Sequence, residues 1–407
     1  MQGESDMLKT VTKGIFKPNS KDSTDFTERI IRAYYNTNKG TESESSTGNS
    51  SKESALSNNS NKNEKSYINI NKDNLELNSE RAAEKDKKMA TVSNHSPQII
   101  SIGGGKGGIG KSFLSANICV RLATLGFKVS VVDLDLGAAN LHTCLGVPTP
   151  QKGISDFIHG NVSTLEETGI SCCLPNLTLY GGGQEFWQQI KPQSSQKIKL
   201  ISKLQELDAD YVFLDLGAGT HIHTLDFFIF SHGGILVVAP EPTSIENAYV
   251  FMKSVLYRKI QSICKAFEIE EEVESELLKK ISNPKNSETP FSQIINFAQK
   301  HREVGKQIKD MIEATNIGII MNQVRTKEDR DLGESMSIIC NKYFGFSSKF
   351  LGSTRYDDAV WKSVRVRRPL IIDYPLSTIA VNINHITDRI IKMFMQNQSK
   401  DNEEKAG

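Results

Sequence analysis

Short, almost uninterrupted apolar segments alternate with helix-like segments along residues 96–396, and this alternation is the strongest structural signal in the chain. Residues 98–104 form the first apolar segment, and residues 113–126 after it repeat apolar side chains at helical spacing. Further apolar segments lie at 128–135, 176–183, 211–217, 234–240 and 317–324. Buried strands that alternate with helices predict an α/β fold, with a mostly parallel twisted sheet and helices on both faces.

Three segments depart from this alternation. Residues 1–95 are rich in Ser, Asn, Lys and Glu and have little to bury, so we expect a disordered low-complexity tail. Residues 261–315 have helical character throughout and interrupt the strand pattern, which indicates a helical insertion with a break at Asn283 and Pro284. Residues 397–407 form a polar C-terminal tail. The sequence therefore predicts one ordered domain at 96–396.

Bulk composition says more about the cellular compartment of the protein than about its activity. The 407 residues carry a formal net charge of +1, so no global field attracts the chain to nucleic acid or to anionic lipid. The sequence contains no apolar run of the roughly 20 residues needed to span a bilayer, and its start shows no secretory segment. None of the six cysteines forms a C-x-x-C pair, which disfavours a metal-cluster carrier. We expect a cytoplasmic protein.

The loop after the first apolar segment carries a complete phosphate-binding motif. Residues 105–112 read GKGGIGKS, which fits G-x-x-x-x-G-K-[ST] between a predicted strand and a predicted helix. Glycines let backbone N–H groups turn toward an anion, and the following helix directs its positive end there. Lys111 can then reach the β- and γ-phosphates, while the Ser112 hydroxyl can ligate Mg²⁺. The predicted nucleotide-binding residues here are Gly105, Lys106, Gly107, Gly108, Ile109, Gly110, Lys111 and Ser112.

A second lysine in the loop, Lys106, gives the motif the form K-G-G-x-G-K-[ST]. This form resembles the deviant Walker A loop of the MinD/ParA family of P-loop ATPases. The resemblance implies that Lys106 reaches across an ATP-bound homodimer to the phosphates of the partner. There it would add positive charge where the transition state gathers negative charge. ATP and Mg²⁺ are the implied cofactors, and Lys106, Lys111 and Asp135 the implied catalytic residues.

Other segments resemble the remaining nucleotide elements of this family. In residues 131–146, VVDLDLGAANLHTCLG, the resemblance implies that Asp135 orients the attacking water and that Asp133 supports the metal site. It places Asn140 in the same switch region. Residues 211–219, YVFLDLGAG, resemble a Walker B strand, which implies that Asp215 holds Mg²⁺ through water and Gly217 senses the γ-phosphate. Asn322, within IIMNQV, would contact adenine.

Two stretches narrow the family resemblance to one branch. Residues 239–253, APEPTSIENAYVFMK, and the closing segment 351–383 are similar to flagellar number regulators of the FlhG/FleN type. The resemblance implies an ATP-dependent dimerisation switch that hydrolyses ATP slowly and regulates flagellar number or placement. Its implied protein partners are flagellar basal-body components or a GTPase of the signal-recognition type.

The sequence leaves several alternatives open. One is a partition or polar-positioning ATPase that acts on nucleoid or membrane, and another is a nucleotide-gated scaffold that does not hydrolyse ATP. Residues 386–396 form an amphipathic helix that suits either a membrane surface at the inner face of the membrane or packing on the sheet. Arg365, Arg367 and Arg368 form a basic cluster that suits either DNA contact or a solvated surface, and DNA is the less favoured partner.

Overall fold

The computed structural model describes residues 96–135, 140–181, 194–282 and 288–405. The predicted tail at 1–95 lies outside these residues, and so does the predicted helix break at Asn283 and Pro284. Residues 96–405 belong to one compact unit.

The described strands match all six apolar segments and add two, β3 and β8. They are β1 (Gln98–Gly103), β2 (Val129–Leu134), β3 (Gly169–Ser171), β4 (Leu177–Tyr180), β5 (Tyr211–Leu216), β6 (Gly233–Val238), β7 (Asn316–Val324) and β8 (Ser347–Arg355). The order across the sheet is β3-β4-β2-β5-β1-β6-β7-β8. The pairing of β3 with β4 is antiparallel, and the other pairs are parallel. The sheet is therefore mostly parallel, as the pattern predicted.

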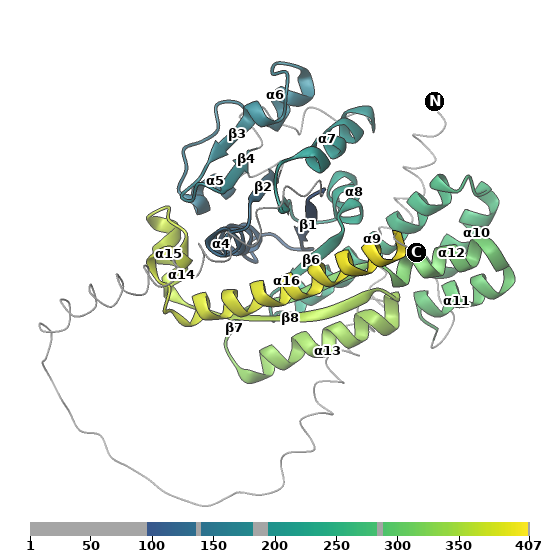
Figure 1. Ribbon diagram of the computed structural model, residues 1–407. Coiled ribbons are helices and arrows are strands. Elements are labelled where there is room, and N and C mark those ends of the chain that lie inside the picture. Colours follow the sequence, from purple (N-terminus) through teal and green to yellow (C-terminus); the bar gives the residue numbers. More distant parts are fainter. Residues whose placement is uncertain (1–95, 136–139, 182–193, 283–287, 406–407) are drawn as a thin grey trace, which may run out of the picture. The chain divides into compact units, whose positions relative to one another are not determined.

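Helices cover both faces of this sheet (Figure 1). They are α4 (Lys111–Thr124), α5 (Leu141–Leu145), α6 (Ile154–His159), the 3₁₀ helix η1 (Glu166–Thr168), α7 (Ser194–Glu206), α8 (Ile222–Phe230), α9 (Pro242–Ala266), α10 (Glu271–Ser282), α11 (Pro290–Lys300), α12 (Arg302–Glu313), α13 (Lys327–Phe344), α14 (Asp358–Arg365), α15 (Leu370–Asp373) and α16 (Thr378–Lys405). Successive residues of one strand enter opposite cores: Ile99 packs with α9 and α13, and Ile100 with α4 and α16. This alternation explains why the strands are apolar throughout.

The helical insertion is a bundle of α10, α11 and α12 that follows α9. Because α9 continues to Ala266, position 261 lies inside a helix that covers the sheet, and the insertion's own helices begin at Glu271. Leu277, Ile281 and Phe297 of the bundle are buried in the same core as α9. The bundle thus extends one core of the domain. Helix α16 reaches Lys405 and runs through most of the polar segment 397–407.

Candidate nucleotide-binding site

The phosphate loop joins β1 to α4 at the centre of the sheet, where β1 lies between β5 and β6. Because β1, β2 and β5 are parallel, their carboxyl ends meet at one edge. Asp133 of β2 and Asp215 of β5 are register partners in neighbouring strands. The topology therefore brings two of the predicted acidic residues together beside the loop.

Two glycines show why the loop has its glycine-rich composition. A Cβ atom on Gly105 would lie 2.1 Å from the carbonyl oxygen of Asn247 in α9. Gly110 has φ of +87°, and a Cβ atom there would lie 2.3 Å from Nδ2 of Asn322 in β7. A side chain at Gly105 would collide with the backbone of α9. One at Gly110 would be strained by the positive φ and would displace the Asn322 amide. The loop is therefore held between these two elements in a fixed curve.

Lys111 opens α4 and points into the interior, with 7% of its surface exposed. Burial lowers the pKa of its ammonium group, and the carboxylates of Asp215 and Asp135 act in the opposite direction. A bound phosphate would add negative charge at the same place and favour the charged lysine further. The site is thus suited to an anionic ligand at Lys111.

Asp215 lies at the end of β5 and is fully buried. Its Oδ1 accepts a hydrogen bond of 2.8 Å from the Ser115 hydroxyl, whereas its Oδ2 has no hydrogen-bond partner among the described residues. Burial raises the pKa of this carboxyl group to about 6, although the hydroxyls of Ser112 and Ser115 oppose the shift. A buried carboxylate oxygen without a partner beside a serine hydroxyl is a donor set that fits Mg²⁺. The described residues contain no cluster of three or more His, Cys, Asp or Glu side chains suited to a metal.

Asp133 is also buried, but both of its carboxylate oxygens are engaged by backbone groups. Oδ1 accepts from the N–H of Asp135 at 3.1 Å, and Oδ2 from the N–H of Leu141 at 3.2 Å. Burial, reinforced by the charge of Asp215, raises the pKa of this carboxyl group to about 8. These bonds fix Asp135 and the start of α5, so Asp133 has a positioning role, and its support of a metal stays a prediction.

The structure also places Asp135 beside Gly217, the residue predicted to sense the γ-phosphate. A Cβ atom on Gly217 would lie 3.1 Å from Oδ1 of Asp135. The N–H of Gly219 donates to the carbonyl of Gly104 at 3.1 Å, which ties the segment after β5 to the phosphate loop. Asn140, in contrast, is an exposed residue at the start of α5. Asp135 and Gly217 thus converge, while no described contact joins Asn140 to them.

Asn322 is buried in β7 and bridges two elements. Its Nδ2 donates to the carbonyl oxygen of Ile109 at 2.6 Å, and its Oδ1 accepts from the hydroxyl of Thr354 in β8. The amide therefore braces the phosphate loop against the sheet. The bond to Ile109 uses one of the two N–H groups of this amide, and the other is left to donate to a ligand. Contact of Asn322 with adenine stays a prediction.

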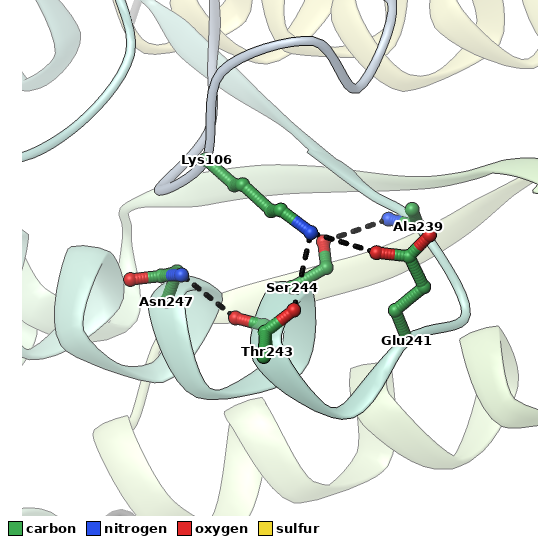
Figure 2. A network of polar contacts seen from close by, with 6 residues as sticks. All are labelled: Lys106, Ala239, Glu241, Thr243, Ser244 and Asn247. Atoms are coloured by element: carbon green, nitrogen blue, oxygen red, sulfur yellow. Dashed lines mark hydrogen bonds and ion pairs between the residues drawn. The ribbon is translucent and has the colours of Figure 1, made fainter.

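Lys106 lies on the outer side of the loop, and α9 of the same chain holds it (Figure 2). Its Nζ is 2.7 Å from Oε2 of Glu241 and 3.1 Å from Oγ1 of Thr243. The Ser244 hydroxyl accepts from the N–H of Ala239 at 3.0 Å and fixes the turn that presents Glu241. The sequence reasoning used this stretch only to choose a family branch and missed its contact with Lys106. The EPTS motif was the available signal.

A cavity of about 300 Å³ at the carboxyl ends of β7 and β8 was also missed. The guanidinium carbon of Arg325 lies 4.4 Å from the ring centroid of Tyr356, and both side chains line the cavity with Asp357 and Thr378. The cavity opens at the sheet edge that also carries the phosphate loop.

Comparisons with known proteins bear on the fold and the family of the chain. Residues 100–370 match the family model CbiA, the CobQ/CobB/MinD/ParA nucleotide binding domain. The antiactivator FleN of Pseudomonas aeruginosa is 23% identical over 305 residues, which cover 75% of this chain and 89% of FleN. The flagellum site-determining protein YlxH of Helicobacter pylori is 36% identical over 161 residues, which cover 38% of this chain and 53% of YlxH.

Among solved structures, the cell division ATPase MinD of Pyrococcus furiosus has the same fold. It is 20% identical, with a TM-score of 0.50, and the match covers 72% of this chain and 98% of that protein. The predicted α/β P-loop fold and the predicted family are both confirmed. Because the family model spans more than half of its length, the chain belongs to the CobQ/CobB/MinD/ParA nucleotide-binding family.

Proposed function

We propose that this chain is an ATP-binding dimerisation switch of the MinD/ParA type that hydrolyses ATP slowly and regulates flagellar number or placement. The observation that carries the proposal is that the two lysines of one loop lie on opposite sides of it, one buried and one exposed. Lys111 faces the buried carboxylates, whereas Lys106 lies on the exposed side. A lysine on that side is accessible to the nucleotide of a second copy.

The residues of the site divide the chemistry as follows. Lys111 and the loop N–H groups bind the phosphates, and Ser112 with Asp215 would hold Mg²⁺, which neutralises phosphate charge when bound. Asp135 lies beside Gly217 and orients the attacking water. The base occupies the cavity lined by Arg325 and Tyr356.

The flagellar role rests on the relatives. FleN is an antiactivator and YlxH determines the flagellum site. By analogy we propose protein partners from the flagellar basal body or a GTPase of the signal-recognition type, a cytoplasmic protein, and peripheral association with the inner face of the membrane. A purification of the ATP-locked protein that recovers chromosome-segregation proteins instead would favour the partition alternative.

Asp135→Ala tests the switch. The variant should bind Mg·ATP, release phosphate at least about 100-fold more slowly, and accumulate as an ATP-bound dimer. Phosphate release and multi-angle light scattering would measure turnover and mass. Asp208→Ala is the matched control, because its carboxylate is exposed and pairs with Lys128.

Unchanged turnover and unchanged mass in Asp135→Ala would refute the assigned role. A wild-type protein that binds ATP and dimerises without releasing phosphate would instead be the nucleotide-gated scaffold.

A further inference from the structure

The apolar side chains on one face of the amphipathic C-terminal segment are buried, so this face is not available to a membrane. Ile386, Ile390, Met393 and Phe394 are each at most 5% exposed. They belong to the core that α16 shares with α4 and Leu351 of β8, and Figure 1 shows α16 lying along the sheet. The apolar face that the sequence offered to lipid is thus consumed by packing inside the domain. None of the described helices is long and apolar enough to cross a bilayer.

A different element exposes apolar side chains. Trp361 is 61% exposed, Val366 57% and Leu376 85%. Trp361 lies on α14, Val366 directly follows α14, and Leu376 follows α15. Figure 1 shows these two short helices at the edge of the domain next to α5. The unit is anchored from below, because Ser363 is buried and the N–H of Ile371 donates to Oδ1 of Asn117 in α4 at 3.0 Å. The exposed residues are therefore carried by a fixed support.

The same segment is basic. Lys362, Arg365, Arg367 and Arg368 lie between residues 361 and 372, where the sequence has no acidic residue. Arg368 pairs with Asp373 at 3.0 Å, while the other three form no ion pair within the described part of the chain. Arg365 places its guanidinium carbon 5.1 Å from the ring centroid of Trp361. The guanidinium group of Arg365 and the large ring of Trp361 are thus presented together.

We infer that this surface, defined by Trp361, Lys362, Arg365, Val366, Arg367 and Leu376 and named here the α14–α15 surface, docks on an anionic lipid bilayer. Basic side chains are attracted to anionic headgroups, and a tryptophan ring suits the boundary between headgroups and acyl chains. Exposed valine and leucine gain from that boundary. A phosphate backbone offers them no apolar partner, which separates this surface from a DNA-binding one.

The α14–α15 surface is joined to the candidate nucleotide site. Asp357 lines the cavity at Tyr356 and also caps α14, since its Oδ1 accepts from the N–H of Ala359 at 2.8 Å. On the other side, the carbonyl oxygen of Arg367 would lie 2.4 Å from a Cβ atom on Gly146, at the end of α5. Docking is therefore measured with Mg·ATP, with Mg·ADP and without nucleotide. The inference does not depend on hydrolysis.

Tryptophan fluorescence reports the contact directly. The chain has two tryptophans, so Trp187→Phe leaves Trp361 as its single tryptophan. With vesicles in which about one lipid in three is phosphatidylglycerol, the emission of Trp361 should shift to the blue and be quenched by brominated acyl chains. Vesicles of phosphatidylcholine alone should give neither change. Absence of both changes with anionic vesicles in every nucleotide state would overturn the inference.

Charge and apolar variants of the full chain identify the surface. Lys362→Gln/Arg365→Gln/Arg367→Gln should weaken vesicle binding roughly 100-fold, about fivefold for each cation, and Val366→Ser/Leu376→Ser should weaken it about tenfold. The matched control is Lys306→Gln/Lys327→Gln/Lys342→Gln, which removes three exposed lysines elsewhere.

Nucleotide titration and circular dichroism of each variant would show that folding and the ATP site are intact. Control and test variants that bind vesicles equally would overturn the inference. A test variant that loses binding to duplex DNA but keeps vesicle binding would overturn it in favour of a DNA surface. If the wild-type protein does not bind ATP, that result counts against the proposed switch and leaves the inference about the α14–α15 surface unaffected.

Discussion

The two sides of the phosphate loop differ in how the chain holds their lysines. On the inner side, Lys111 is 7% exposed and lies in the field of Asp215 and Asp135. On the outer side, Lys106 has a side chain that is 36% exposed and pairs with Glu241, which is itself 55% exposed. One lysine belongs to the core of the domain and the other to its surface.

The difference teaches which contact can be exchanged. Interactions among buried charges are strong because water does not screen them, and the fold fixes their geometry. An exposed ion pair is worth little, so the partner of Lys106 can be replaced at low cost. In the proposed switch, one copy of the chain therefore binds the phosphates through Lys111, whereas the position of Lys106 responds to a second copy.

The largest expected effect is on turnover. Lys106→Ala should lower the rate of phosphate release about 1,000-fold, because it removes positive charge from the transition state. Nucleotide affinity should change less than about threefold, since the inner side is intact. Single-turnover phosphate release and equilibrium titration with ATP would separate the two quantities.

Lys111→Ala is the contrast for that experiment. It should weaken ATP binding at least about 100-fold, because a charge-assisted contact in a buried site is lost. If Lys106→Ala instead weakened binding as much as Lys111→Ala does, the two sides of the loop would have the same role and the comparison would fail.

The inner side could be predicted from sequence because its information is local. The motif at 105–112 fixes the loop, and parallel strands with apolar interiors bring Asp133 and Asp215 to the same edge. Buried strands and a glycine-rich loop leave a recognisable pattern in a single stretch of residues. The motif alone predicted the placement of Lys111, whereas Asp215 and Gly217 were predicted from the resemblance of residues 211–219 to a Walker B strand.

The outer side of the loop and the cavity at Tyr356 could not be predicted in this way. Lys106 and Glu241 are 135 positions apart, and an exposed ion pair leaves no periodicity in the sequence. Strand β8 was missed because its buried positions include Ser348 and Thr354, so it lacks a continuous apolar run. Without β8 the partner of Asn322 and the cavity at Tyr356 have no position.

A smaller effect should appear in the pH dependence of stability. The pKa of Asp133 is raised from 3.8 to about 8, so the folded protein binds this proton more tightly than the unfolded chain does. The stability that the protonated group contributes is complete below pH 3.8 and is lost as the pH rises to about 8. Asp133→Asn cannot ionise. Its stability relative to the wild type should increase by on the order of 1–3 kcal/mol between pH 6 and pH 9.

Denaturant unfolding of the nucleotide-free protein at the two pH values measures this difference. Asp208→Asn is the control, since its carboxylate is exposed and pairs with Lys128 at the surface. If the free energy of unfolding has the same pH dependence in Asp133→Asn and in the wild type, folding does not raise the pKa of Asp133, and the prediction is wrong.

The smallest expected effect tests the outer side. Glu241→Gln keeps the shape of the side chain but removes the charge that holds Lys106, and Thr243→Val removes the second acceptor. Because the ion pair is exposed, the free energy of unfolding should change by less than about 0.5 kcal/mol. Freed Lys106 should favour the proposed ATP-bound dimer by up to about fivefold, measured by analytical ultracentrifugation at several concentrations. Adding Lys106→Ala to these substitutions decides the cause. If the gain in dimer persists without the lysine, the effect comes from α9 itself, and the exchange of partners proposed for Lys106 is wrong.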